Sequence, residues 1–184
     1  MKECVYETAS GNIHYWINDI RPDRINQVML PGLTADHHLF DKQIEAFEQE
    51  YNVFAWDAPG HAASRPFRLN FTLMDKAEWL HEILVKEQIT RPILIGQSMG
   101  GYVSQCFMQK YPGEVSGFVS IDSAPLKRCY VTAFEIWALK NTEPMYRAFP
   151  YKMLQNIGIK GCAETEYGRE LMKSFVNSYT KDEY

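Results

Sequence analysis

One short segment constrains the fold of this chain more than any other: a serine between two glycines, in the pentapeptide Gly96–Gly100 (GQSMG). An apolar run, Ile93–Ile95, precedes it, and a helical pattern, Tyr102–Tyr111, follows it. A tight turn from a strand into a helix strains the residue at its tip and leaves no room for a Cβ on the residues beside it. The segment therefore predicts a nucleophile elbow with Ser98 at its tip; a tight turn with an inert serine is the alternative.

Apolar runs alternate with helical patterns through the first two thirds of the chain. The expected strands are Gln27–Leu30, Val53–Trp56, Pro92–Ile95 and Gly117–Ile121, and the expected helices cover about residues 39–51, 73–87 and 99–111. Thr72 and Asp75 would form a capping box for the second helix, and a Gly/Asn turn at residues 9–12 predicts an initial β-hairpin. The alternation predicts an α/β fold: a mainly parallel sheet with helices on both faces, and an active site beyond the carboxyl ends of its strands.

The sequence pattern changes after Pro125. Residues 133–184 show patterns for several short helices and none for a strand. Aromatic side chains recur along this stretch, at Trp137, Tyr146, Phe149, Tyr151 and Phe175. We therefore expect two parts, residues 1–126 with the sheet and residues 127–184 as a partial helical lid over an apolar pocket.

Composition excludes several classes of partner. The 184 residues carry a net charge of −4 with scattered Lys and Arg, which offers no basic stripe for nucleic acid, and no apolar stretch is long enough to span a membrane. The N-terminus has no apolar signal region, which favours the cytoplasm. The four widely spaced cysteines predict free thiols; Cys129 is either reactive or an ordinary packing residue. We expect a small-molecule partner with an apolar portion, and neither a cofactor nor a metal.

Three motifs, in this order, resemble those of one family. They are residues 29–34 (MLPGLT), residues 56–66 (WDAPGHAASRP) and residues 96–101 (GQSMGG), each directly after an expected strand. Residues 28–126 resemble the α/β-hydrolase superfamily in its compact esterase and lactonase-like branch, and the final third is similar to a variable cap. The resemblance implies a serine hydrolase that acts on an ester, thioester or lactone carbonyl through an acyl-enzyme on Ser98.

The resemblance also implies roles for residues around Ser98. The backbone amides of Leu33 and Met99 would form the oxyanion hole, although Pro31 stands where relatives often have histidine. A simple Pro-Gly loop is the alternative for the first of these segments. Asp57 would bond local backbone amides without a catalytic role, and His61 would be a loop histidine with local partners or would line the pocket.

The triad of such an enzyme is incomplete in this sequence. The family order is serine, acid, histidine, yet all five histidines (His14, His37, His38, His61 and His81) precede Ser98. Asp122, at the end of the last expected strand, is a candidate acid or a structural aspartate. We therefore expect a fragment that stops within its cap and lacks the C-terminal strands of the core, so that Gly117–Ile121 forms an exposed edge able to self-associate.

Three alternatives to this interpretation stay open. His37 or His38 could have been recruited as the base for Ser98. A non-catalytic member of the same fold could use the pocket or the sheet edge for binding alone. Acyl transfer to an acceptor other than water, or cofactor-free peroxidation, could use the same scaffold.

Overall fold

The computed structural model describes residues 1–127, 132, 137, 141 and 150–180. The chain divides into two units, Met1–Ala124 and Pro125–Tyr184. The sequence places the boundary two residues further along, at 126. The expectations about Tyr146, Phe149 and Cys129 lie outside the described residues.

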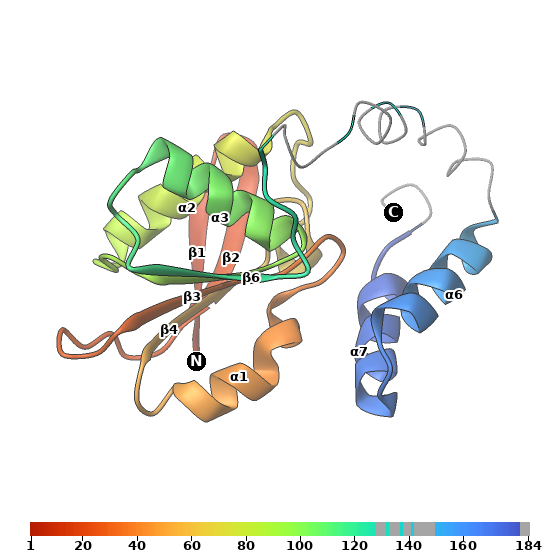
Figure 1. The fold of residues 1–184 in the computed structure, drawn as a ribbon, viewed down its shortest axis with the longest axis horizontal. Coiled ribbons are helices and arrows are strands. Elements are labelled where there is room, and N and C mark those ends of the chain that lie inside the picture. The colour runs from red at the N-terminus through yellow and green to blue at the C-terminus, as the bar shows by residue number, and fades with distance from the viewer. Residues whose placement is uncertain (128–131, 133–136, 138–140, 142–149, 181–184) are drawn as a thin grey trace. The chain divides into compact units, whose positions relative to one another are not determined.

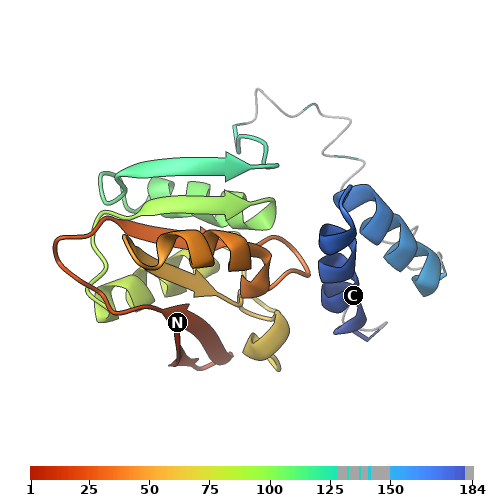
Figure 2. The ribbon, with the colours of Figure 1, turned by 90° about the horizontal axis from the view of Figure 1, so that it is seen from below.

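The first unit is built on one six-stranded sheet, with strands in the order β1-β2-β4-β3-β5-β6. These strands are β1 (Lys2–Thr8), β2 (Gly11–Ile17), β3 (Asn26–Leu30), β4 (Asn52–Trp56), β5 (Ile93–Gln97) and β6 (Gly117–Ile121). β1 and β2 form the expected hairpin, and β2 pairs antiparallel with β4. The pairs β3–β4, β3–β5 and β5–β6 are parallel, which confirms the mainly parallel sheet. Figure 2 shows β6 at one edge of this sheet.

Helices cover both faces of the sheet, as the sequence predicts. They are α1 (Asp41–Phe47), α2 (Leu73–Lys86) and α3 (Met99–Lys110), with short 3-10 helices at His37–Phe40 (η1) and Ala62–Ser64 (η2). In Figure 1, α2 and α3 lie on one face and α1 lies on the other. The expected helix at 39–51 is therefore two elements, η1 and α1, because Asp36 caps a separate 3-10 turn through its bond to the His38 amide.

Successive side chains along the strands point to opposite faces of the sheet, and each face has its own apolar cluster. Val28, Phe54 and Leu94 belong to the larger one, which also contains the buried apolar side chains of α2 and α3. Met29 and Val53 point to the opposite face and contact the smaller cluster with Phe40 and Ile44 of η1 and α1. Since the strands are buried on both faces, they read in the sequence as continuous apolar runs.

The capping box predicted for α2 is present. Thr72 accepts a hydrogen bond from the Asp75 amide, and the Asp75 carboxylate accepts one from the Thr72 amide. The helix therefore begins at Leu73, where the sequence places it.

The described part of the second unit contains two helices, α6 (Tyr151–Cys162) and α7 (Glu166–Asn177). Thr165 caps α7 by accepting a bond from the Gly168 amide, and Phe175 and Val176 at its end are buried. Trp137 is 60% exposed. In the described part of the chain, no helix has the length and apolar character that a membrane crossing requires.

Candidate active site

Ser98 lies at the junction between β5 and α3. Its backbone has φ 49° and ψ −114°, outside the regions that non-glycine residues favour, which confirms the strained turn predicted for it. Its N–H donates to the Ile121 carbonyl at 2.8 Å, and its carbonyl accepts from the Gly101 N–H at 3.0 Å and the Ser123 hydroxyl at 2.9 Å. Residues at and just beyond the end of β6 therefore hold the elbow in place.

The two glycines of the motif are required by close backbone approach. A Cβ on Gly96 would lie 2.5 Å from the Gly101 nitrogen, and a Cβ on Gly100 would overlap the carbonyl oxygen of Leu30. These neighbours are backbone atoms of packed elements, so they cannot move aside cheaply. The sequence rule for glycine at both positions is thus explained by contacts of α3 with β5 and β3.

The loop after β3 passes directly beside Ser98. Leu30 is in register with Gly96, and a Cβ added to Gly32 would lie 3.2 Å from the Ser98 Cβ. Among the described residues, the amides of Leu33 and Met99 donate to no partner. Met99 is the first residue of α3, where amides have no acceptor within the helix. Two uncommitted donors thus come from segments that adjoin Ser98; their convergence on one space stays a prediction.

No base contacts the Ser98 hydroxyl within the described part of the chain, where that hydroxyl makes no hydrogen bond. Each histidine has a ring nitrogen near another oxygen: His14 near Glu3, His37 near Asp57, His38 near Asp41, His61 near the Pro59 carbonyl, and His81 near Glu114. The hypothesis that His37 or His38 is the base therefore gains no support from its contacts.

His37 and Asp57 form a pair at the carboxyl ends of β3 and β4, in which Asp57 is buried and His37 is half-buried. The His37 Nδ1 lies 2.8 Å from the Asp57 Oδ1, which also accepts the His37 amide at 3.0 Å, and the ring stacks on Trp16 at 3.5 Å. The other Asp57 oxygen accepts the Ala63 amide at 2.9 Å. The hydrogen bonds that Asp57 accepts from these backbone amides are those that the sequence predicts for it. The pairing with His37 was missed because the two residues lie on separate loops.

Negative charge is concentrated around this pair. Burial raises the pKa of Asp36 above its usual range, and the Asp57 charge contributes to the increase. Asp57 itself is only 1% exposed. The loop end of β3 and β4 is therefore a place where a positive charge would be stabilised.

Lys76 and His61 are two buried basic groups, and Lys76 contacts the elbow residue Met99. Lys76 is 4% exposed, its Nζ donates to the Met99 sulfur at 3.2 Å, and it lies 5.2 Å from the centre of the Phe71 ring. Burial lowers the pKa of Lys76 to about 8. Burial, and next the Lys76 charge, lower the pKa of His61 to about 4, so this imidazole is neutral near pH 7. Sequence reasoning missed Lys76, because a lysine on a helix is ordinarily taken as exposed.

Asp122 follows β6 and adopts φ 51°. Its chain neighbours Ile121 and Ser123 both bond the Ser98 backbone, so the main chain at Asp122 lies close to the elbow. The side chain is exposed, and in the described residues its carboxylate makes no hydrogen bond. A role as triad acid stays a prediction.

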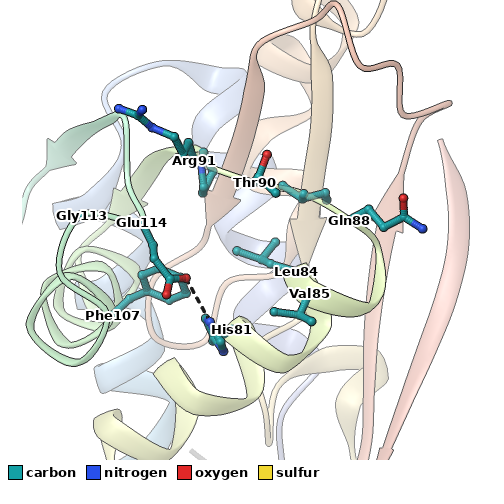
Figure 3. Close-up of a pocket in the computed structure, with 11 residues that line it drawn as sticks. His81, Leu84, Val85, Gln88, Thr90, Arg91, Phe107, Gly113 and Glu114 are labelled. Carbon is teal, nitrogen blue, oxygen red and sulfur yellow. Dashed lines mark hydrogen bonds and ion pairs between the residues drawn. The ribbon is translucent and has the colours of Figure 1, made fainter.

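A cavity of about 440 Å³ lies at the other end of the strands (Figure 3). It is bordered by Pro92, which precedes β5, by the end of α2 and by Phe107 of α3. In Figure 3, His81 points toward Glu114, and their side chains are 3.0 Å apart. Ser98 follows the carboxyl end of β5, so this cavity is separate from the candidate active site.

Comparison with known proteins agrees with the architecture. A family model described as the alpha/beta hydrolase fold matches residues 28–159. A serine O-succinyltransferase from Frateuria aurantia is 36% identical over 80 residues, which cover 41% of this chain and 22% of that protein. An Escherichia coli protein named "Putative carbamate hydrolase RutD" is 28% identical over 110 residues, 56% of this chain and 41% of that protein.

Among solved structures, Est816, described as an N-acyl homoserine lactone degrading enzyme, superposes with a TM-score of 0.73 at 18% identity, over 95% of this chain and 65% of that chain. At that identity, the match shows a shared fold only. The aligned segments span less than half of the two curated relatives. The family model covers well over half of the 184 residues and matches the expectation from the motifs; the chain therefore belongs to the alpha/beta hydrolase fold family.

Proposed function

We propose that this chain carries the nucleophile and the oxyanion hole of a serine hydrolase that acts on an ester, thioester or lactone. The conformation of Ser98 is the observation that carries the proposal. A non-glycine residue at φ 49°, held through its own N–H and carbonyl by residues 101, 121 and 123, is a costly arrangement. In this fold, that arrangement serves to present a nucleophile.

The chemistry proceeds in two steps. The Ser98 Oγ loses its proton to a base and attacks the substrate carbonyl, and the resulting oxyanion is stabilised by the amides of Leu33 and Met99. Collapse of this intermediate expels the leaving group, which takes up the proton, and leaves an ester on Ser98. Water then attacks that ester by the same route, which releases the acid and restores the hydroxyl.

The base and the acid that orients it complete the proposal. All five histidines precede Ser98 in the sequence, and the polar contacts that the structure describes for their ring nitrogens are with oxygens other than the Ser98 hydroxyl. We place the triad histidine beyond residue 184, in a longer protein of which this chain is a part. The partial coverage of the curated relatives supports this placement. Asp122 is one candidate for the acid.

Acyl transfer is a second candidate function. It is favoured by the match to a protein named serine O-succinyltransferase, which is 36% identical over 80 residues. The first half of the reaction is the same, and a hydroxyl of an acceptor molecule takes the place of water in the second half. A binding protein without catalysis is a further alternative, and its best support is that no histidine follows Ser98 in these 184 residues.

The test compares hydrolysis of a short-chain aryl ester by this chain, by a chain extended at its C-terminus to the end of the reading frame, and by the Ser98→Ala variant of each. We expect the extended chain to exceed the present one by about 10³-fold or more, because loss of a triad member removes that much rate. Ser116→Ala, at a serine outside the elbow, is the matched control and should leave the rate unchanged.

Two outcomes would contradict the proposal. Equal rates for the extended chain and its Ser98→Ala variant would remove Ser98 as the nucleophile. Full activity of the present chain, lost in Ser98→Ala, would show that a base lies within these 184 residues, and His37, His38 and His61 would be the first to mutate. Addition of an acceptor alcohol separates transfer from hydrolysis by the appearance of a new ester.

A further inference from the structure

Contrary to the expectation of no metal from the sequence, we propose that Asp36, His37 and His38 bind a divalent transition-metal ion such as Zn²⁺. One ligand atom from each of these residues lies within 4.8 Å of the other two. Imidazole nitrogen and carboxylate oxygen are both common zinc ligands. The proposal does not rest on the serine chemistry proposed above, which places the base beyond residue 184 and assigns no step to these three residues.

Both histidines place one ring nitrogen on a carboxylate, as histidine metal ligands usually do. The His37 Nδ1 lies 2.8 Å from a carboxylate oxygen of Asp57, and the His38 Nδ1 lies 3.2 Å from both oxygens of Asp41. In both rings Nε2 makes no hydrogen bond with a described residue, so we assign it as the metal ligand. Histidine ligands in metalloproteins almost always place their other nitrogen on a carboxylate, a carbonyl or water, which fixes the tautomer and the ring plane.

The third ligand is also positioned by the fold. The Asp36 Oδ1 accepts the His38 amide at 2.9 Å and caps η1. The second oxygen makes no hydrogen bond with a described residue. The His37 ring has two restraints: it stacks on the Trp16 ring, with 3.5 Å between the ring centroids, and it pairs with Asp57.

The charges around the site favour a cation. Three carboxylates, those of Asp36, Asp41 and Asp57, surround two imidazoles. In the described part of the chain, neither Lys nor Arg forms an ion pair with any of the three. With neutral imidazoles, the cluster carries three negative charges, so a bound dication removes most of their mutual repulsion.

The cluster must contract slightly to hold a metal. Ligands at about 2.1 Å from a tetrahedral zinc lie about 3.4 Å apart, so a spread of 4.8 Å requires a contraction of up to about 1.4 Å. The His38 side chain is 55% exposed and can supply that movement by rotation. Three protein ligands leave a fourth position for water.

The experiment titrates the full 184-residue chain with Zn²⁺ by calorimetry and with Co²⁺ by visible absorption. We expect one equivalent of metal to bind to the wild-type chain. His38→Gln and Asp36→Asn should each weaken binding about tenfold or more, because even outer residues of such sites contribute that much. Neither change should unfold the chain, since His38 is exposed and asparagine also caps helices. Circular dichroism checks that both variants are folded.

His81→Gln is the matched control, because His81 also places a ring nitrogen on a carboxylate but lies outside the cluster. It should bind metal like the wild-type chain. Unchanged affinity in both cluster variants would overturn the proposal, as would an equal loss in His81→Gln. Absence of binding to the wild-type chain would overturn it as well.

Discussion

Ser98 combines a strained backbone with contacts that prevent its relaxation. A non-glycine residue with φ 49° costs on the order of 1–3 kcal/mol, and the bonds to Ile121 and Ser123 hold it there. At this one position, stability and the proposed function therefore oppose each other. The strain is caused by the Cβ of Ser98 and not by the turn itself, because glycine adopts positive φ without a Cβ clash.

This opposition predicts that Ser98→Gly is more stable than the wild-type chain. The free energy gained by removing the Cβ clash should exceed the entropic cost of ordering glycine, which is more flexible in the unfolded chain. The net gain in stability should be about 1 kcal/mol. Urea unfolding at pH 7 measures it. Ser98→Ala, which keeps the Cβ, is the control and should stay near the wild-type value. A glycine variant less stable than the alanine variant would show that Ser98 is not strained.

Lys76 gives a second prediction at the scale of single residues. Its charged form is disfavoured in the folded state, where burial lowers its pKa to about 8, from 10.5. The unfolded chain therefore holds the proton more tightly between pH 8 and 10.5, and the folding penalty is full below this range and disappears as the pH rises through it. At pH 7 that penalty is about 3 kcal/mol.

Lys76→Met, which places an apolar side chain of similar size beside Met99, should therefore stabilise the chain at pH 7 by up to about 3 kcal/mol. The gain should fall to about half by pH 9.5 as the wild-type amine loses its charge. Urea unfolding at both pH values provides the measurement. Lys42→Met, at a lysine with 69% of its side chain exposed, should change little at either pH. A gain that does not depend on pH would mean that burial of charge is not the cause.

At the scale of elements, β6 is the most exposed strand of the parallel part of the sheet. Val119 is 45% exposed and Ile121 is 41% exposed. β6 pairs with β5 on one side, and no described strand pairs with it on the other. An apolar edge with unpaired backbone groups is a template for pairing with another strand.

We accordingly expect concentration-dependent self-association of the 184-residue chain through β6, and Val119→Lys should reduce it at least several-fold. A charge on an edge strand opposes strand addition without disturbing the buried faces. Analytical ultracentrifugation over a range of concentrations measures the effect. Val85→Lys, on the exposed side of α2 where valine is 63% exposed, is the matched control. Equal effects of the two changes would indicate general surface repulsion, not edge pairing.

The positions of helices and turns were predictable where residues close in the sequence determine them. The start of α2 followed from Thr72 and Asp75, and the elbow from two glycines around Ser98. The helix expected at 39–51 was wrong in its first turn, because the Asp36 carboxylate caps a 3-10 turn before α1 begins at Asp41. Caps formed by aspartate mark a start without specifying which kind of helix follows.

At the scale of the whole molecule, the sheet brings together residues that the sequence keeps apart. The parallel register aligns the ends of β3, β5 and β6, so Gly32, Ser98 and Ser123 become neighbours. A family motif can indicate each segment but not the side-chain pairs between segments. The His37–Asp57 pair and the contact of Lys76 with Met99 depend on loop paths and on rotamers, and they emerged only from the structure.

The two bonds from residues 121 and 123 to the Ser98 backbone also suggest an order in which this region folds during synthesis. The carbonyl of Ile121 and the hydroxyl of Ser123, which hold the elbow, come 23 and 25 residues after Ser98 in the chain. A ribosome-bound chain that ends before them has β5, α3 and the bond from the Gly101 N–H to the Ser98 carbonyl, but it lacks both bonds from residues 121 and 123. We therefore expect the turn at Ser98 to be fully restrained only after β6 has left the exit tunnel and joined the sheet.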